Sequence, residues 1–228
     1  GTIPNYAEEL KLIRALRKDF GPDMPIIDTF FDPFQQVLRK AGFSAAKMIY
    51  GNKREALHML DAVTRTVCAY MQELKQAGCD AVLYSINGAI APPGDRGIDD
   101  ATFQTFLRPF DLRVLEAMQG MVRILHVHGT HVDMRRVLDY PVEVFSVSDR
   151  LTGNPSLAEL RKLTGKCLMG GINEQKIAER SAPEIRAEIE DAVRQAGKRN
   201  FILAPGCTSP PQTPEHILRC VRETSRAF

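Results

Sequence analysis

The sequence lacks several features that would assign it to a class immediately. Its 30 lysines and arginines almost balance its 28 aspartates and glutamates, which leaves a formal net charge of +2 and none of the basic excess typical of nucleic-acid binding. No apolar run reaches the ~18 residues that a membrane-spanning helix needs. The first residues, Gly1 to Pro4, form neither the basic nor the apolar part of a secretory leader. We therefore expect no nucleic-acid or membrane partner.

The cysteines are too few and too scattered for a disulfide framework. There are five, an odd number, at positions 68, 79, 167, 207 and 220. This usage indicates a reducing compartment, and we expect a cytoplasmic protein. Most of the five have the sequence setting of small buried hydrophobic residues. Only Cys207, in a turn rich in glycine and proline, has a setting that suggests chemistry.

The chain does contain a regular alternation of short apolar runs and longer amphipathic runs. The apolar runs predict strands covered on both faces, at 25–30, 81–86, 123–128, 142–147, 167–170 and 201–204. The amphipathic runs predict helices at 7–19, 34–40, 53–77, 100–118, 133–138, 156–163, 183–196 and 214–227. Helix-capping signals, such as Ser181 before Pro183 and Gly197 after the helix, support these boundaries.

This alternation predicts a parallel sheet with helical crossovers. The chain carries neither the GxGxxG fingerprint of a dinucleotide-binding sheet nor a phosphate-binding loop, so we favour a (β/α)8 barrel. Such a barrel typically needs about 250 residues, and only six strands are predicted. We expect a single barrel domain over residues 1–228, beginning with Gly1 instead of Met, in which about six of eight βα units are visible and two N-terminal units are missing.

Two histidines stand at the end of the third predicted strand, in the segment Leu125-His126-Val127-His128-Gly129. Side chains two apart on a strand point to the same face, so both imidazoles can meet at the mouth of the barrel. Neutral imidazole is a good zinc ligand. The alternative interpretation is one core histidine and one loop histidine.

Cys207 follows the last predicted strand and would reach the same mouth. Two imidazoles and one thiolate provide three ligands and leave a fourth position open, which is the arrangement of a catalytic zinc ion. Asp149, just past another strand, could be a displaceable fourth ligand or could orient an imidazole; it could also simply pair with Arg150.

Further polar and aromatic side chains follow other strands. His131 is a spare donor close to the predicted metal site, and Asn87 and Ser85 can donate or accept hydrogen bonds at the end of their strand. Phe31 offers an aromatic wall for a cofactor. The loop 91–97, rich in glycine and proline, could cover the mouth or could be an ordinary surface loop.

Several segments together resemble the uroporphyrinogen decarboxylase superfamily, including its methyltransferase branch. The resemblance covers nearly the whole chain and rests on a proline-aromatic helix start, an "AGAD"-like turn, an "F-x-x-P-Y"-like helix, an "LSVD"-like strand, a "GN-D"-like turn and a "G-H-G…P-x-T-P-E"-like closing segment. These are Pro33-Phe34, Gln76–Val82, Phe106–Phe110, Phe145–Val147, Gly170–Asn173, and Gly206-Cys207 with Pro211–Glu215. The resemblance implies a (β/α)8 barrel.

The resemblance also suggests a branch within the superfamily. Corrinoid-dependent methyltransferases of the superfamily carry His-x-Cys-Gly on this strand and a closing cysteine, and these bind zinc. Here His126-Val127-His128-Gly129 and Cys207 stand in those places, so an imidazole replaces one thiolate and the ligand charge falls from −2 to −1. An acidic residue also follows the neighbouring strand in that branch, where this chain has Asp149.

The leading expectation is therefore a zinc-dependent methyl transfer between a corrinoid and a thiol or similar acceptor. The partners would be a small-molecule substrate and a corrinoid protein, and a homodimer is also possible. One alternative is a metal-free decarboxylase of porphyrin biosynthesis, with His126 or His128 as the proton donor. Another is a non-catalytic barrel that binds a corrinoid or tetrapyrrole.

Overall fold

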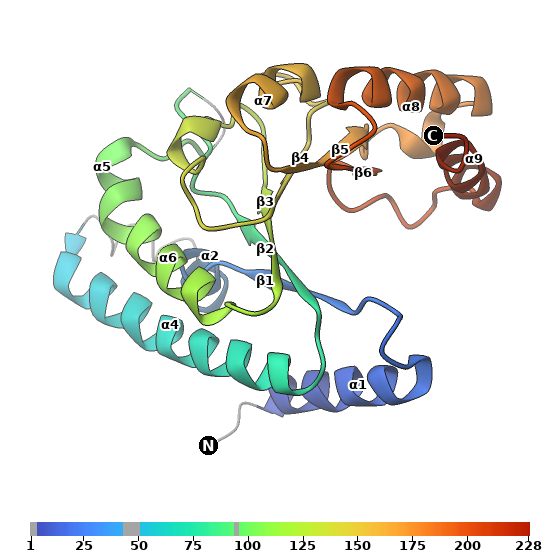
Figure 1. Ribbon diagram of the computed structural model, residues 1–228. Helices are drawn as coiled ribbons and strands as arrows, with labels where there is room; N and C mark the ends of the chain where they lie inside the picture. The colour runs from blue at the N-terminus through green and yellow to red at the C-terminus, as the bar shows by residue number, and fades with distance from the viewer. Residues whose placement is uncertain (1–3, 43–50, 94–95) are drawn as a thin grey trace. The chain divides into compact units, whose positions relative to one another are not determined.

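The computed structural model describes residues 4–42, 51–93 and 96–228 (Figure 1). Strands and helices alternate along it, and the strand order in the sheet is the sequence order. The strands are β1 Ile27–Phe31, β2 Ala81–Ile86, β3 Val122–Val127, β4 Val144–Val147, β5 Cys167–Ile172 and β6 Phe201–Pro205. The predicted α/β class with six parallel strands is confirmed, and the β2 boundaries agree at both ends.

The helices also follow the prediction closely. Their bounds are α1 Pro4–Phe20, α2 Pro33–Ala41, α4 Lys53–Gln76, α5 Asp100–Thr102, α6 Arg108–Ala117, α7 Leu157–Leu163, α8 Ala182–Ala196 and α9 Glu215–Ser225. Capping explains several starts. Asp32 accepts a hydrogen bond from the Gln35 backbone at the start of α2, and a capping box of Ser156 and Glu159 opens α7.

Two predicted helices were wrong in detail. The single helix expected over 100–118 is interrupted by a π-helical segment, Phe103–Leu107, in which the Arg108 N–H bonds to the Phe103 carbonyl five residues back. Pro109 has no N–H to donate, so the regular ladder is broken at this point. The helix expected over 133–138 is only a 3-10 turn, Met134–Arg136, because its backbone N–H groups bond three residues back.

The chain divides into two compact units. The first contains residues up to 88, 98–125 and 140–142, and the second contains 89–97, 126–139 and 143–228. In the first unit β1 runs parallel to β2, with Ile27 opposite Ala81 and Phe31 opposite Ser85. In the second unit β5 pairs in parallel with both β4 and β6. Of the predicted cover loop 91–97, Gly94 and Asp95 lie outside the described residues.

A buried polar network lies inside the apolar core of the first unit. Asp111, on α6, is 1% exposed and accepts hydrogen bonds from the hydroxyls of Tyr84 at 2.7 Å and Tyr140 at 3.0 Å. Burial raises the pKa of Asp111 well above its usual range, and the charge of Asp32 adds to the effect. Because each carboxyl oxygen of Asp111 accepts a hydrogen bond, we assign this network a structural role in the first unit.

The core of the second unit lies where α8 and α9 meet β5. Isoleucines dominate it, and every one is at most 1% exposed: Ile172, Ile177, Ile185, Ile189 and Ile217. Figure 1 shows α8 and α9 near the end of the chain; α8 packs against β5 and β6, and α9 packs against α8. Within the described residues, no helix combines the length and the apolar character that crossing a bilayer would require. Ile177 belongs to the segment after β5, so this core holds that segment in place.

Candidate metal centre

His126 is held inside the second unit by a neighbouring strand. It lies on β3, is 5% exposed, and its Nδ1 is 3.1 Å from the hydroxyl oxygen of Ser146 on β4. Its other ring nitrogen, Nε2, is buried and has no hydrogen-bond partner. A metal-bound histidine usually has one nitrogen engaged by the protein and the other directed to the ion. His126 has this arrangement.

His128 and Cys207 complete a group of three donors around His126. The ring centroids of the two histidines are 5.5 Å apart, and Cys207 Sγ lies 3.5 Å from His128 Nδ1. One donor atom from each of the three residues lies within 4.8 Å of the others, the one group of its kind found among the described residues. The neighbouring imidazole of His126 lowers the pKa of the Cys207 thiol, which favours the thiolate that metals bind.

The glycine before Cys207 allows the chain to pass through a narrow space. Its N–H bonds to the Ile172 carbonyl at 3.0 Å, which ties the loop after β6 to the end of β5. A Cβ atom on Gly206 would lie 2.5 Å from Ser148 Cα and 2.7 Å from Glu174 Oε2. Only glycine fits this position without movement of the Ser148 backbone, so the position of Cys207 depends on it.

Asn154 connects the loops that follow β3 and β4. Its amide nitrogen donates to the carbonyls of Gly129 at 2.8 Å and Ser148 at 2.9 Å, and its amide oxygen accepts from the Val132 N–H at 3.2 Å. Gly129 has φ +111°, a conformation that favours glycine. The Asn154 side chain therefore holds the backbone after His128 through Gly129 and Val132.

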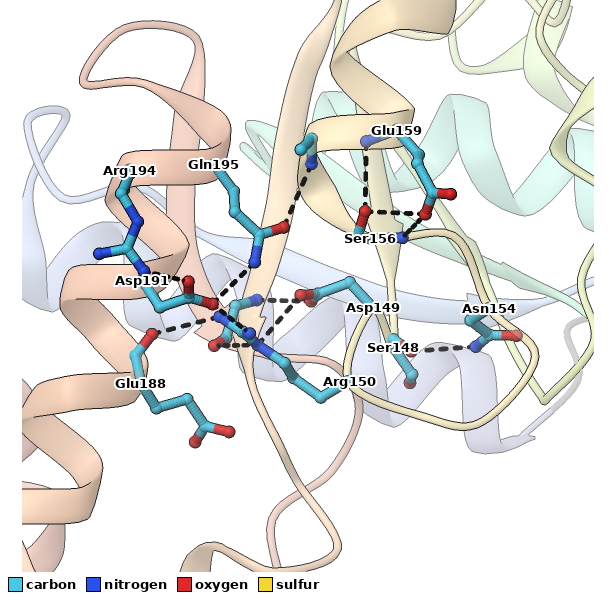
Figure 2. Close-up of polar contacts among 12 residues, drawn as sticks. Ser148, Asp149, Arg150, Asn154, Ser156, Glu159, Glu188, Asp191, Arg194 and Gln195 are labelled. Atoms are coloured by element: carbon cyan, nitrogen blue, oxygen red, sulfur yellow. Dashed lines mark hydrogen bonds and ion pairs between the residues drawn. The ribbon is translucent and has the colours of Figure 1, made fainter.

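Two contacts hold the carboxyl group of Asp149 in place. Its Oδ1 accepts the Gly171 N–H at 2.7 Å, and its Oδ2 is 3.3 Å from Arg150 Nε. The Arg150 guanidinium also donates hydrogen bonds to the Asp191 side chain on α8 at 2.6 Å and to the Glu188 carbonyl at 3.2 Å (Figure 2). Burial raises the pKa of Asp149, opposed by the Gly171 hydrogen bond and by Arg150. Asp149 is outside the group of three donors, and its Oδ2 is buried without a hydrogen-bond partner.

The other predicted site residues are not part of the group of three donors. His131 is exposed with φ +57°, and its ring packs on Gly153, where a Cβ would lie 2.5 Å away. Phe31, Ser85 and Asn87 belong to the first unit. The Arg39 guanidinium lies over the ring of Phe31, 4.1 Å from the ring centre. The sequence analysis gave no role to Ser146, Asn154, Gly206 or Glu174, although Ser146 and Gly206 lie inside two of the segments that carry the family resemblance.

In the first unit, Asp32 connects Asn87 and Ser85 to the start of α2. Its backbone N–H bonds to the Ser85 carbonyl at 3.0 Å, and its carboxylate accepts from the Gln35 side chain at 2.9 Å and the Asn87 N–H at 3.4 Å. Asn87 Oδ1 is buried without a hydrogen-bond partner. Burial raises the pKa of Asp32 to about 6, opposed mainly by its hydrogen bonds from Gln35.

This raised pKa predicts a pH-dependent stability. Because the folded-state pKa is above the unfolded value, the contribution of Asp32 is fully present below the unfolded pKa of 3.8 and is lost as the pH rises through about 6. A shift of two pKa units corresponds to about 3 kcal/mol. We expect the free energy of unfolding of Asp32→Asn, relative to wild type, to rise by about that much between about pH 4 and pH 7.

Urea denaturation at several pH values measures this difference. Asparagine keeps a capping oxygen for the Gln35 N–H, so the helix start is preserved. Asp111 is the neighbouring buried carboxyl, and the double variant with Asp111→Asn separates its contribution. A difference between Asp32→Asn and wild type that does not change with pH would contradict the assignment.

The residues present fit a transition metal ion. Two imidazoles and one thiolate are donor types that zinc accepts, and His126 Nε2 is buried without a hydrogen-bond partner, as is expected of a ring nitrogen that faces an ion. Three protein ligands leave a position for a substrate. The candidate site therefore has a donor set that could hold a catalytic metal ion, and all three donors belong to the second unit.

Comparison with known proteins identifies the family. The uroporphyrinogen decarboxylase (URO-D) family matches residues 4–228, so the chain belongs to that family. It is 28% identical over 220 residues to the methylcobamide:CoM methyltransferase MtaA of Methanosarcina barkeri, covering 93% of this chain and 60% of that protein. It is 21% identical over 223 residues to MtbA of Methanosarcina acetivorans, covering 96% and 63%.

A solved structure shows the same fold. The structure of a methyltransferase from Methanosarcina mazei superposes with a TM-score of 0.80 at 22% identity, over 96% of this chain and 63% of that one. The six βα units are thus those of a (β/α)8-barrel fold. The chain spans about three fifths of the length of the curated relatives it matches.

Proposed function

We propose that this protein transfers a methyl group from a corrinoid to a small thiol, with a zinc ion held by His126, His128 and Cys207. The observation that carries the proposal is the convergence of these three donors within 4.8 Å. The similarity to two methylcobamide:CoM methyltransferases supports the choice of a corrinoid as methyl donor and of a thiol as acceptor. A corrinoid protein would be the partner that presents the methyl group.

The residues of this chain would contribute in distinct ways. A bound zinc ion would act as a Lewis acid that lowers the pKa of a thiol. His126, His128 and Cys207 would hold it, and Ser146 would orient His126 through Nδ1. Asp149 would hold the end of β5 in place through the Gly171 N–H. Overall, the thiolate sulfur forms a bond to the methyl carbon, the carbon–cobalt bond breaks, and cobalt keeps the electron pair.

The donor set has one cysteine where the resembling methyltransferases have two, and this difference changes the expected reactivity of the metal. With one thiolate in place of two, the metal would be more electrophilic, and the thiolate bound to it would be a weaker nucleophile. This would favour acceptor thiols with greater intrinsic nucleophilicity. Asn87, Ser85 and Phe31 remain our proposed corrinoid contacts, and His131 our proposed additional donor.

The test is a methyl-transfer assay with methylcobalamin and a panel of small thiols that includes CoM. We expect loss of the methylcobalamin absorbance together with an S-methylated thiol detected by mass spectrometry. A strong chelator should abolish the reaction and zinc should restore it. Decarboxylation of uroporphyrinogen that persists with chelator, without any methyl transfer, would refute the proposal and support the metal-free decarboxylase.

A further inference from the structure

We propose that Asn154 is a positioning residue that sets the spacing between the metal donors His128 and Cys207, an inference that rests on the proposed function. Asn154 lies in the loop that follows β4, in the same unit as both donors. Its side chain is partly buried, and its hydrogen bonds go to main-chain groups of the loops after β3 and β4. Asn154 therefore acts on the donors through the backbone.

The first connection runs to His128. Gly129 follows His128 directly, and its carbonyl accepts a hydrogen bond from Asn154 Nδ2 at 2.8 Å. Three residues further on, the Val132 N–H donates to Asn154 Oδ1 at 3.2 Å. The same turn packs against Ile90, which forms an antiparallel bridge with Val132 and whose Cδ1 would lie 2.6 Å from a Cβ on Gly129. The backbone that carries His128 is therefore fixed relative to the Asn154 amide.

The second connection runs to Cys207 through Ser148. The Ser148 carbonyl accepts a hydrogen bond from Asn154 Nδ2 at 2.9 Å and another from the Leu151 N–H at 3.1 Å. Ser148 is 2% exposed, and its Cα is so close to the loop after β6 that a Cβ on Gly206 would lie 2.5 Å from it. Gly206 directly precedes Cys207. A shift of the Ser148 backbone would therefore displace Cys207.

One planar amide group thus joins two carbonyls that are linked to the two donors. The N–H groups of a primary amide have a fixed relative orientation, so the Gly129 and Ser148 carbonyls are held at a defined separation. The distance between His128 Nδ1 and Cys207 Sγ is 3.5 Å. Zinc bonds of about 2.05 Å to nitrogen and about 2.3 Å to sulfur, at a tetrahedral angle, place these two atoms about 3.6 Å apart. The spacing that Asn154 maintains is therefore close to the one that a tetrahedral ion requires.

The side chain at position 154 needs the chemistry of asparagine. It donates two hydrogen bonds and accepts one, and a carboxamide has the groups for both tasks. An aspartate of the same shape would direct oxygen toward both carbonyls, which replaces two attractions by two repulsions. An alanine would remove all three hydrogen bonds without adding a charge. The two substitutions therefore disturb the spacing in different ways.

The experiment compares wild type, Asn154→Asp, Asn154→Ala and the control Asn200→Asp. Asn200 is an exposed residue of the same unit, directly before β6. Its φ of +54° is a conformation that asparagine and aspartate both adopt. Each protein is stripped of metal. Zinc affinity is then measured by competition with a coloured chelator, and the visible spectrum is recorded with saturating Co2+.

We expect both Asn154 variants to bind zinc about 10–100-fold more weakly than wild type. Their Co2+ absorption should also change in wavelength and intensity, because the ligand field depends on how the donors are arranged around the ion. Asn200→Asp should match wild type in both measurements. If Asn154→Asp does not fold, Asn154→Ala, which adds no charge, provides both measurements.

Urea denaturation of the metal-free proteins separates positioning from a purely structural role. Asn154 variants that lose free energy of unfolding but keep the zinc affinity and the Co2+ spectrum of wild type would overturn the positioning role and leave the proposed function standing. Wild-type protein that binds no zinc would overturn both. The expected changes in the Asn154 variants, combined with no methyl transfer to any thiol by zinc-loaded wild type, would support the positioning role and refute the proposed reaction.

Discussion

Cys207→Ser is expected to abolish metal retention. Serine offers no thiolate, so the site would lose one of its three close donors and the only charge among them. Even partners that contact a ligand indirectly are worth about 10–100-fold in metal affinity, and we expect a loss of more than about 100-fold here. His128→Ala should have the same outcome, because His128 Nδ1 is the donor 3.5 Å from Cys207 Sγ.

The measurement is zinc per chain in protein purified without added zinc, by elemental analysis after dialysis. Cys167→Ser is the matched control, because this half-buried cysteine is also in the second unit but outside the donor group. We expect about one zinc ion per chain in wild type and in this control. Full zinc content in Cys207→Ser would exclude the three-donor site.

Arg150→Met is expected to cause the largest loss of stability of any charged side chain discussed above. Its guanidinium bonds to the Gly171 carbonyl at 3.0 Å, to Asp191 at 2.6 Å and to the Glu188 carbonyl at 3.2 Å (Figure 2). Its removal leaves the Asp149 side chain, which is 1% exposed, without its counter-charge. Breaking a buried pair in this way costs about 3–5 kcal/mol.

Urea denaturation of the metal-free protein measures the loss. The matched control is Arg194→Met, which removes a 72% exposed arginine paired with the same Asp191. An exposed pair is worth about 0–1 kcal/mol, so the loss of unfolding free energy should be several-fold larger for Arg150→Met than for Arg194→Met. The double variant Asp149→Asn with Arg150→Met should recover part of the loss, because no buried charge is then left unpaired. Equal effects of Arg150→Met and Arg194→Met would contradict this account.

The elements of the fold were predictable because local patterns determine them. Apolar runs marked all six strands, and a capping residue followed by a proline marked the start of α8 at Ser181. The interruption at Phe103–Leu107 was missed although Pro109 was visible. A proline predicts that a helical ladder breaks, but how the neighbouring turn adjusts depends on packing around Phe103 and Phe106, both buried.

The three donors could also be predicted, and their supporting residues could not. His126 and His128 are two apart on a strand, and Cys207 follows another strand of the same parallel sheet, so strand geometry alone brings them to one edge. Ser146 supports the site through a hydrogen bond to His126, and Asn154 does so through bonds that include one to the Gly129 carbonyl; these partners are 20 and 25 positions away in sequence. A serine on a strand or an asparagine in a loop carries no signal of such contacts.

The sequence by itself therefore determined the α/β class, the order of the elements and which side chains could bind a metal, because periodicity and residue chemistry are local properties. Only the tertiary structure decided the surroundings of the acidic residue after β4. Asp149 was chosen from its place after a strand, and in the structure its Oδ1 accepts the Gly171 N–H while Arg150 lies beside its Oδ2. Whether a carboxylate is free or engaged depends on which distant residues fold against it.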